Sequence, residues 1–168
     1  MTTGRAIEAY GVLGVVGMLV VGVVRLLRHV AMTLDGGLGV AEVVGAAAIL
    51  VFMAYVEGYR GFHLRFSPRV VARARWVASD PRPIRVVLLP LLCMGLFAAT
   101  RRRLIASWAL TAMILFFIVA VRTLPDPWRG LVDLGVVCGL TIGCLSMLYW
   151  WMVALRGRAL PVDADAPG

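Results

Sequence analysis

The sequence contains no lysine, only nine acidic residues and only 15% charged residues among its 168 positions. Soluble domains have a charged fraction of about a quarter, so this shortage of charge excludes an ordinary soluble domain. Hydrophobic residues make up 61% of the chain, and the mean hydropathy is +0.91. The composition therefore indicates an integral membrane protein.

Cysteine and histidine are also scarce. Cys93, Cys138 and Cys144 all lie in apolar stretches and lack the CxxC spacing of zinc or redox motifs, and their odd number argues against a disulfide framework. We expect His29 and His63 on opposite sides of the membrane, where they cannot bind one metal ion together. The sequence therefore predicts buried thiols, no metal site and no cofactor.

Common catalytic motifs are missing as well. The chain has no GxxxxGK(S/T) phosphate loop, no HExxH zinc motif and no GxSxG nucleophile elbow. The sequence therefore assigns no catalytic residue and favours a non-catalytic protein over an enzyme.

Apolar runs divide the chain at residues 9–24, 38–55, 86–100, 104–121 and 134–155. Because about 20 apolar residues make a membrane-spanning helix, we predict an all-α, polytopic membrane helical bundle. The first run is too long for a signal peptide and lacks a small-residue cleavage pattern. We expect residues 1–160 to form a single integral membrane domain with a basic cytoplasmic loop at 57–85, followed by a disordered tail at 161–168.

The run at 86–100 is ambiguous, because it contains Pro90 and makes only about 22 Å of helix against a hydrocarbon core of about 30 Å. If it does not cross, thirteen of the seventeen arginines share one side; if it crosses, the split is ten to seven. The positive-inside rule favours the first arrangement. We predict four transmembrane helices plus a short Pro-containing re-entrant or interfacial segment, with both termini cytoplasmic, in a bacterial cytoplasmic membrane. Five transmembrane helices are the alternative.

Glu57, Tyr59, Arg60 and His63 form a candidate polar site directly after the second run. Glu57 and Arg60 are three residues apart, a spacing that places them on one face of an α-helix. In one interpretation, Glu57, Arg60 and His63 hold a phosphate or relay a proton at the cytoplasmic edge. In the other, Glu57 and Arg60 are an ion pair that lets a helix end lie at the interface.

A basic helix is predicted to follow. Ser67 and Pro68 are typical first residues of a helix, and the apolar residues up to Ala78 share one face, as in a helix that lies flat on a membrane. Arginines of this helix and of its neighbours form a predicted surface for lipid or a partner: Arg65, Arg69, Arg73, Arg75, Arg101, Arg102 and Arg103.

Two features lie within the predicted spans. Gly135, Gly139 and Gly143 form a double GxxxG pattern, which allows close helix packing within the bundle or between two copies. Glu42 is the one acid inside a span, and it is either functional or paired with Arg25 or Arg28.

We expect a small non-catalytic accessory protein or complex subunit. It would pack through its glycine faces and bind anionic lipid, an acidic partner or a second copy of itself, but no nucleic acid, because its arginines adjoin apolar segments. A membrane-embedded enzyme acting on a lipid or isoprenoid phosphate is the alternative. A transporter of small solutes or ions is less well supported, because Glu42 and scattered hydroxyls are the only polar groups in the spans.

Overall fold

Helices are the only regular elements in the computed structural model, which describes residues 2–97 and 99–164. Four helical segments are long and apolar enough to cross a membrane. They are α1 (Thr2–Asp35), the continuous Val40–Ser79 segment, α6 (Arg101–Arg122) and α7 (Trp128–Leu155). The predicted all-helical, multi-pass class is confirmed at this level.

The second long helix has three sections: α2 (Val40–Met53), the π-helix η1 (Ala54–Phe66) and α3 (Ser67–Ser79). The sequence predicted a span ending near Tyr55 and a separate helix starting at Ser67, but the helix continues without a break. A proline has no N–H and crowds the carbonyl four residues earlier. Pro68 is the second residue after the π-helical section, where the hydrogen-bonding register has already departed from that of an α-helix.

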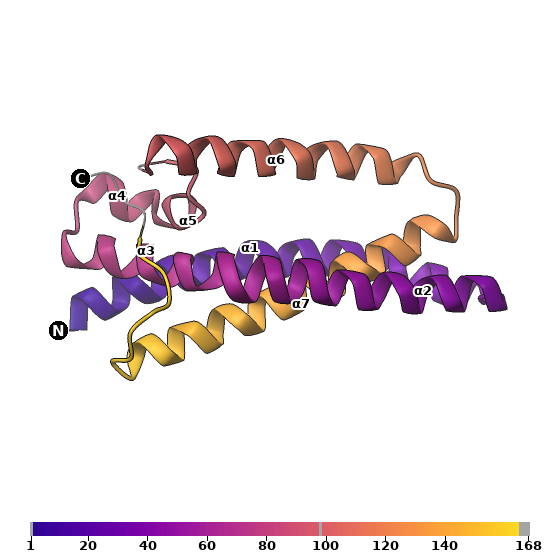
Figure 1. The fold of residues 1–168 in the computed structure, drawn as a ribbon, viewed down its shortest axis with the longest axis horizontal. Coiled ribbons are helices and arrows are strands. Elements are labelled where there is room, and N and C mark those ends of the chain that lie inside the picture. Colours follow the sequence, from indigo (N-terminus) through magenta and orange to yellow (C-terminus); the bar gives the residue numbers. More distant parts are fainter. Residues whose placement is uncertain (1, 98, 165–168) are drawn as a thin grey trace.

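The α1, α2–η1–α3 and α7 helices pack against one another, whereas α6 stands apart from them (Figure 1). In α6 only Ser107 is buried, and many apolar side chains are exposed, such as Phe116 at 72%. Most of the surface of α6 is therefore not covered by the other described helices.

One end of the molecule holds the N-terminus, α3, the first turn of α6 and two short helices, α4 (Pro83–Val87) and α5 (Leu89–Cys93) (Figure 1). We call this the basic end. The main hydrophobic core also lies there, between α1, α3, α5 and the C-terminal half of α7. Its members include Val12, Val15, Val70, Val71, Ala74, Val77, Leu89 and Met147.

This core corrects the prediction of a basic helix lying flat on the membrane. Val70, Val71, Ala74 and Val77 of α3 are fully buried, and α3 packs against α1, α5 and α7. The same amphipathic pattern suits a membrane surface or a protein core, and here the apolar face is covered by protein.

The opposite end of the bundle shows the role of Glu42. Its carboxylate accepts a hydrogen bond from the backbone N–H of Gly39, the residue before α2. An acid in the first turn satisfies an otherwise unpaired N–H and suits the helix dipole. Glu42 therefore caps its own helix. At the other end of the chain, residues 161–164 form no helix, and the rest of the predicted tail, 165–168, lies outside the described residues.

Candidate functional site

The predicted polar site lies entirely within η1, a π-helix of 13 residues. In a π-helix each N–H bonds to the carbonyl five residues earlier, and such turns usually occur singly, often at functional sites. The wider turn changes which side chains share a face. Spacing rules taken from α-helices therefore do not apply between Ala54 and Phe66.

Glu57 illustrates this change. A Cβ atom added to Gly139 of α7 would lie 2.6 Å from Glu57 Oε2, so the carboxylate rests directly on the glycine. Arg60 is exposed instead, and among the described residues no ion pair joins it to Glu57. The hypothesis of a Glu57–Arg60 pair is wrong, because the two side chains share a face only in an α-helical register.

His63 is held by side chains of α7. Its Nδ1 lies 3.2 Å from the Oγ of Ser146, which is buried. Aromatic rings surround the imidazole, with ring-centroid distances of 5.7 Å to Tyr59, 5.7 Å to Tyr149 and 5.6 Å to Trp150. Tyr59 is therefore part of the same cluster, although its own side chain is about half exposed.

The backbone of His63 has a partner on α7 as well. The indole N–H of Trp150 donates to the His63 carbonyl at 2.9 Å. In the π-helical register, shown by the bond from the N–H of Ser67 to the carbonyl of Phe62, the donor to His63 would be Pro68, which has no N–H. Trp150 supplies the hydrogen bond that Pro68 cannot make.

The predicted glycine face of α7 is occupied within the bundle. A Cβ at Gly135 would meet Met53 at 3.0 Å, one at Gly139 would meet Glu57, and one at Gly143 would meet Phe62 at 2.7 Å. The glycines recur every four residues, and the last step along η1, from Glu57 to Phe62, is five residues. The longer step in the π-helix thus places Glu57 opposite Gly139 and Phe62 opposite Gly143.

Arg73 does not lie on the predicted surface. It is only 3% exposed, and its Nη1 donates to the carbonyl of Leu92 at 2.8 Å. A Cβ at Gly95, whose φ is +79°, would lie 2.9 Å from Ser107 Oγ, 3.6 Å from Arg73 Nη1 and 3.7 Å from Arg103 Nε. The hydrogen bond from Arg73 therefore joins the end of α5 to α3. Arg103, which is half-buried, lies near the same glycine.

The remaining arginines of the predicted surface lie at the basic end. Arg65, Arg101 and Arg102 are exposed, and Arg69 is half-buried, with its Nη1 donating to the Arg65 carbonyl at 3.0 Å. The side chain of Arg75 is 42% exposed. Arg65, Arg75, Arg101 and Arg102 therefore place basic groups at the surface.

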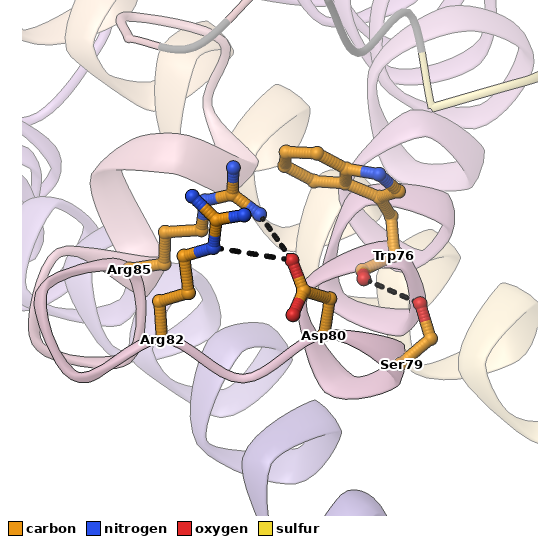
Figure 2. A network of polar contacts seen from close by, with 5 residues as sticks. All are labelled: Trp76, Ser79, Asp80, Arg82 and Arg85. Atoms are coloured by element: carbon orange, nitrogen blue, oxygen red, sulfur yellow. Dashed lines mark hydrogen bonds and ion pairs between the residues drawn. The ribbon is translucent and has the colours of Figure 1, made fainter. Parts of the chain in front are cut away.

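The turn between α3 and α4 is closed by a polar network that the sequence did not reveal (Figure 2). Asp80 Oδ2 accepts from Arg85 Nη1 at 3.0 Å and lies 3.3 Å from Arg82 Nε. The Arg85 guanidinium also lies 4.8 Å from the centre of the Trp76 ring, a cation–π contact. Trp76, which lies on the polar side of the predicted helix, thereby gains a structural role.

A cleft of about 430 Å³ opens at the basic end, where α1, α3 and α7 meet. Its charged lining residues are Arg5 and Glu8 of α1 and Arg75 of α3. No pattern in the sequence indicates this cleft, because Glu8 and Arg75 are far apart in the chain. A second cleft, of about 390 Å³, includes Glu42 and Asp126 at the opposite end. Neither cleft is lined by residues of the predicted polar site.

The other titratable groups are dispersed. His29 Nε2 lies 3.4 Å from Asp126 Oδ1 and 4.0 Å from Asp133 Oδ2, at the end opposite His63. No group of three or more metal-binding side chains occurs in the part of the chain that the structure describes.

The three cysteines are free thiols; Cys93 is buried, and Cys138 and Cys144 are half-buried. The expected burial of the thiols is therefore complete for Cys93 and partial for Cys138 and Cys144.

The four long apolar helices define a multi-pass helical membrane protein. No family model, curated protein or solved structure matches the chain.

Proposed function

We propose that this chain is a small, non-catalytic accessory protein or subunit of a bacterial cytoplasmic membrane, and that its basic end binds anionic lipid headgroups. One observation carries the proposal: exposed arginines from separate elements gather at one end of the bundle. They are Arg65 of η1, Arg75 of α3, and Arg101 and Arg102 of α6. Anionic headgroups attract such groups at a membrane surface.

The arrangement of the candidate polar site supports a non-catalytic role. A catalytic acid, base and anion-binding group must converge on one reacting atom. Glu57 lies against Gly139, Arg60 faces outward, and His63 lies against Ser146. Glu57 and His63 therefore contact α7, and Arg60 does not converge with them on one point.

The placement of α5 supports four crossings with a re-entrant segment. Leu89 packs on Gly11 and Pro90 packs on Gly14 of α1. Since α1 begins at Thr2, Gly14 lies about 18 Å along that helix at 1.5 Å per residue. In this proposal the chain after α4 enters the membrane beside α1 and returns to the same side at Arg101, so that both termini are cytoplasmic.

Lipid retention tests the proposal. R101E/R102E should lower the phosphatidylglycerol that co-purifies per mole of protein in mild detergent by about fivefold or more, because each basic residue near the surface contributes about 1 kcal/mol. The matched control is R25E/R28E, which reverses two exposed charges at the other end of α1. Equal retention by wild type and R101E/R102E, or equal loss in both variants, would contradict it.

A further inference from the structure

The cleft formed by α1, α3 and α7 at the basic end has the volume and position of a headgroup site. Its volume of about 430 Å³ lies within the range of ligand cavities, about 300–1,000 Å³. It opens where α1 begins and α7 ends, and small residues such as Gly4, Ala78 and Ala154 leave it unfilled. Helix ends mark the level of the headgroups in a membrane protein.

Its charges are arranged by depth. Glu8 is the innermost charged residue, only 7% exposed. The side chain of Arg75 is 42% exposed, and its Nε lies 3.9 Å from Glu8 Oε2, beyond the hydrogen-bond range of about 2.7–3.2 Å. Arg5 is exposed and acts electrostatically on the same carboxylate. The cleft therefore has a negative floor and a positive rim.

This arrangement of charges fits a zwitterion with an ammonium and a phosphate group better than it fits a simple anion. A buried carboxylate repels an anion at the floor, whereas an ammonium group there is both attracted and hydrogen-bonded. Exposed guanidinium groups bind a phosphodiester at the rim. In an ethanolamine phospholipid the ammonium is the terminal group of the headgroup. A headgroup that enters the cleft with its ammonium first therefore brings the ammonium to Glu8 at the floor and the phosphate to the two arginines at the rim.

We propose that this cleft binds the headgroup of an ethanolamine phospholipid, with its ammonium on Glu8 and its phosphate between Arg5 and Arg75. The assignment to a lipid rests on the proposed cytoplasmic-edge position of the basic end. The site is separate from Arg101 and Arg102, so it adds selectivity for one headgroup to the general attraction of the arginines.

Native mass spectrometry of the detergent-purified protein tests this site. Wild type should retain phosphatidylethanolamine about tenfold better than phosphatidylcholine, because a charged hydrogen bond contributes about 1.5–3 kcal/mol and trimethylammonium has no N–H. E8Q should lose most of this preference, because its neutral amide oxygen accepts a weaker hydrogen bond than a carboxylate does. E42Q, an acid-to-amide change at the opposite end, should keep the wild-type preference.

R5Q/R75Q should weaken the binding of both lipids, because it removes the guanidinium groups that contact the phosphate. Helical content measured by circular dichroism shows that each variant is folded. The proposal is overturned if wild type has no preference for ethanolamine, or if folded E8Q keeps it. Soluble glycerophosphoethanolamine should compete only weakly, and competition as strong as that of the lipid would contradict a membrane-lipid site. Loss of phosphatidylglycerol retention in R101E/R102E is a separate readout, so the two proposals can fail independently.

Discussion

At the scale of single residues, the contacts of the polar side chains come from residues that are distant in the sequence. Ser146 and Trp150 are 83 and 87 residues from His63. The sequence singled out His63 and Glu57 because polar groups are rare beside apolar runs, but it could not reveal contacts between distant segments. It also misplaced Arg60, because the spacing argument assumed an α-helix, and Arg73, because its pattern suits a membrane surface and a core equally well.

Trp150 is predicted to compensate for Pro68. W150F removes the donor to the part-buried His63 carbonyl and should lower the free energy of unfolding by about 0.5–1.5 kcal/mol, the usual net contribution of one hydrogen bond. Adding P68A supplies a backbone N–H at the position that the π-helical register requires. The double variant should therefore recover part of the loss.

Titration with sodium dodecyl sulfate in mixed micelles, followed by circular dichroism, measures both variants. A double-mutant cycle gives the coupling directly. Strictly additive effects of W150F and P68A would contradict the compensation.

Arg73 is predicted to be structural. R73M leaves the Leu92 carbonyl without its charged donor and should destabilise the protein by about 1.5–3 kcal/mol. R101M, at an exposed position, should change the stability by no more than about 0.5 kcal/mol. The same detergent titration compares the two variants. Equal stability of R73M and R101M would contradict a structural role for Arg73.

At the scale of elements, the glycine pattern of α7 matches the helix that packs on it, which consists of α2 and the π-helix η1. The sequence predicted that another helix approaches Gly135, Gly139 and Gly143, but the pattern does not identify which one. The structure places α2 and η1 there. The π-helix itself was not predictable. It depends on contacts between distant segments: the hydrogen bond from Trp150 replaces the one that Pro68 cannot make, and the side chains of η1 pack on the glycines of α7.

G143A tests this fit. The new Cβ would lie 2.7 Å from two atoms of the Phe62 ring, so the helices must separate or the ring must move, with an expected cost of about 1–3 kcal/mol. G17A is the matched control, because a Cβ at Gly17 meets nothing within 4 Å and alanine favours a helix by about 1 kcal/mol. The free energy of unfolding in mixed micelles should be lower for G143A than for wild type, and for G17A it should equal or exceed that of wild type. The opposite order would refute close packing at this face.

At the scale of the whole molecule, apolar runs predicted the four long helices but not all of their ends. The second helix extends over 40 residues, well beyond its apolar run, because α3 continues it into the core at the basic end. The separation of α6 from the other helices was also not predictable, since its apolar run resembles the others.

The side of the membrane on which Thr100 lies tests the account most directly, because the lipid-binding proposal requires all the arginines of the basic end on the cytoplasmic face. Fusions of a paired cytoplasmic and periplasmic reporter after Thr100 and after Asp126 make the measurement. We predict a cytoplasmic signal after Thr100 and a periplasmic signal after Asp126. A periplasmic signal after Thr100 with a cytoplasmic signal after Asp126 would mean five crossings and would contradict the account.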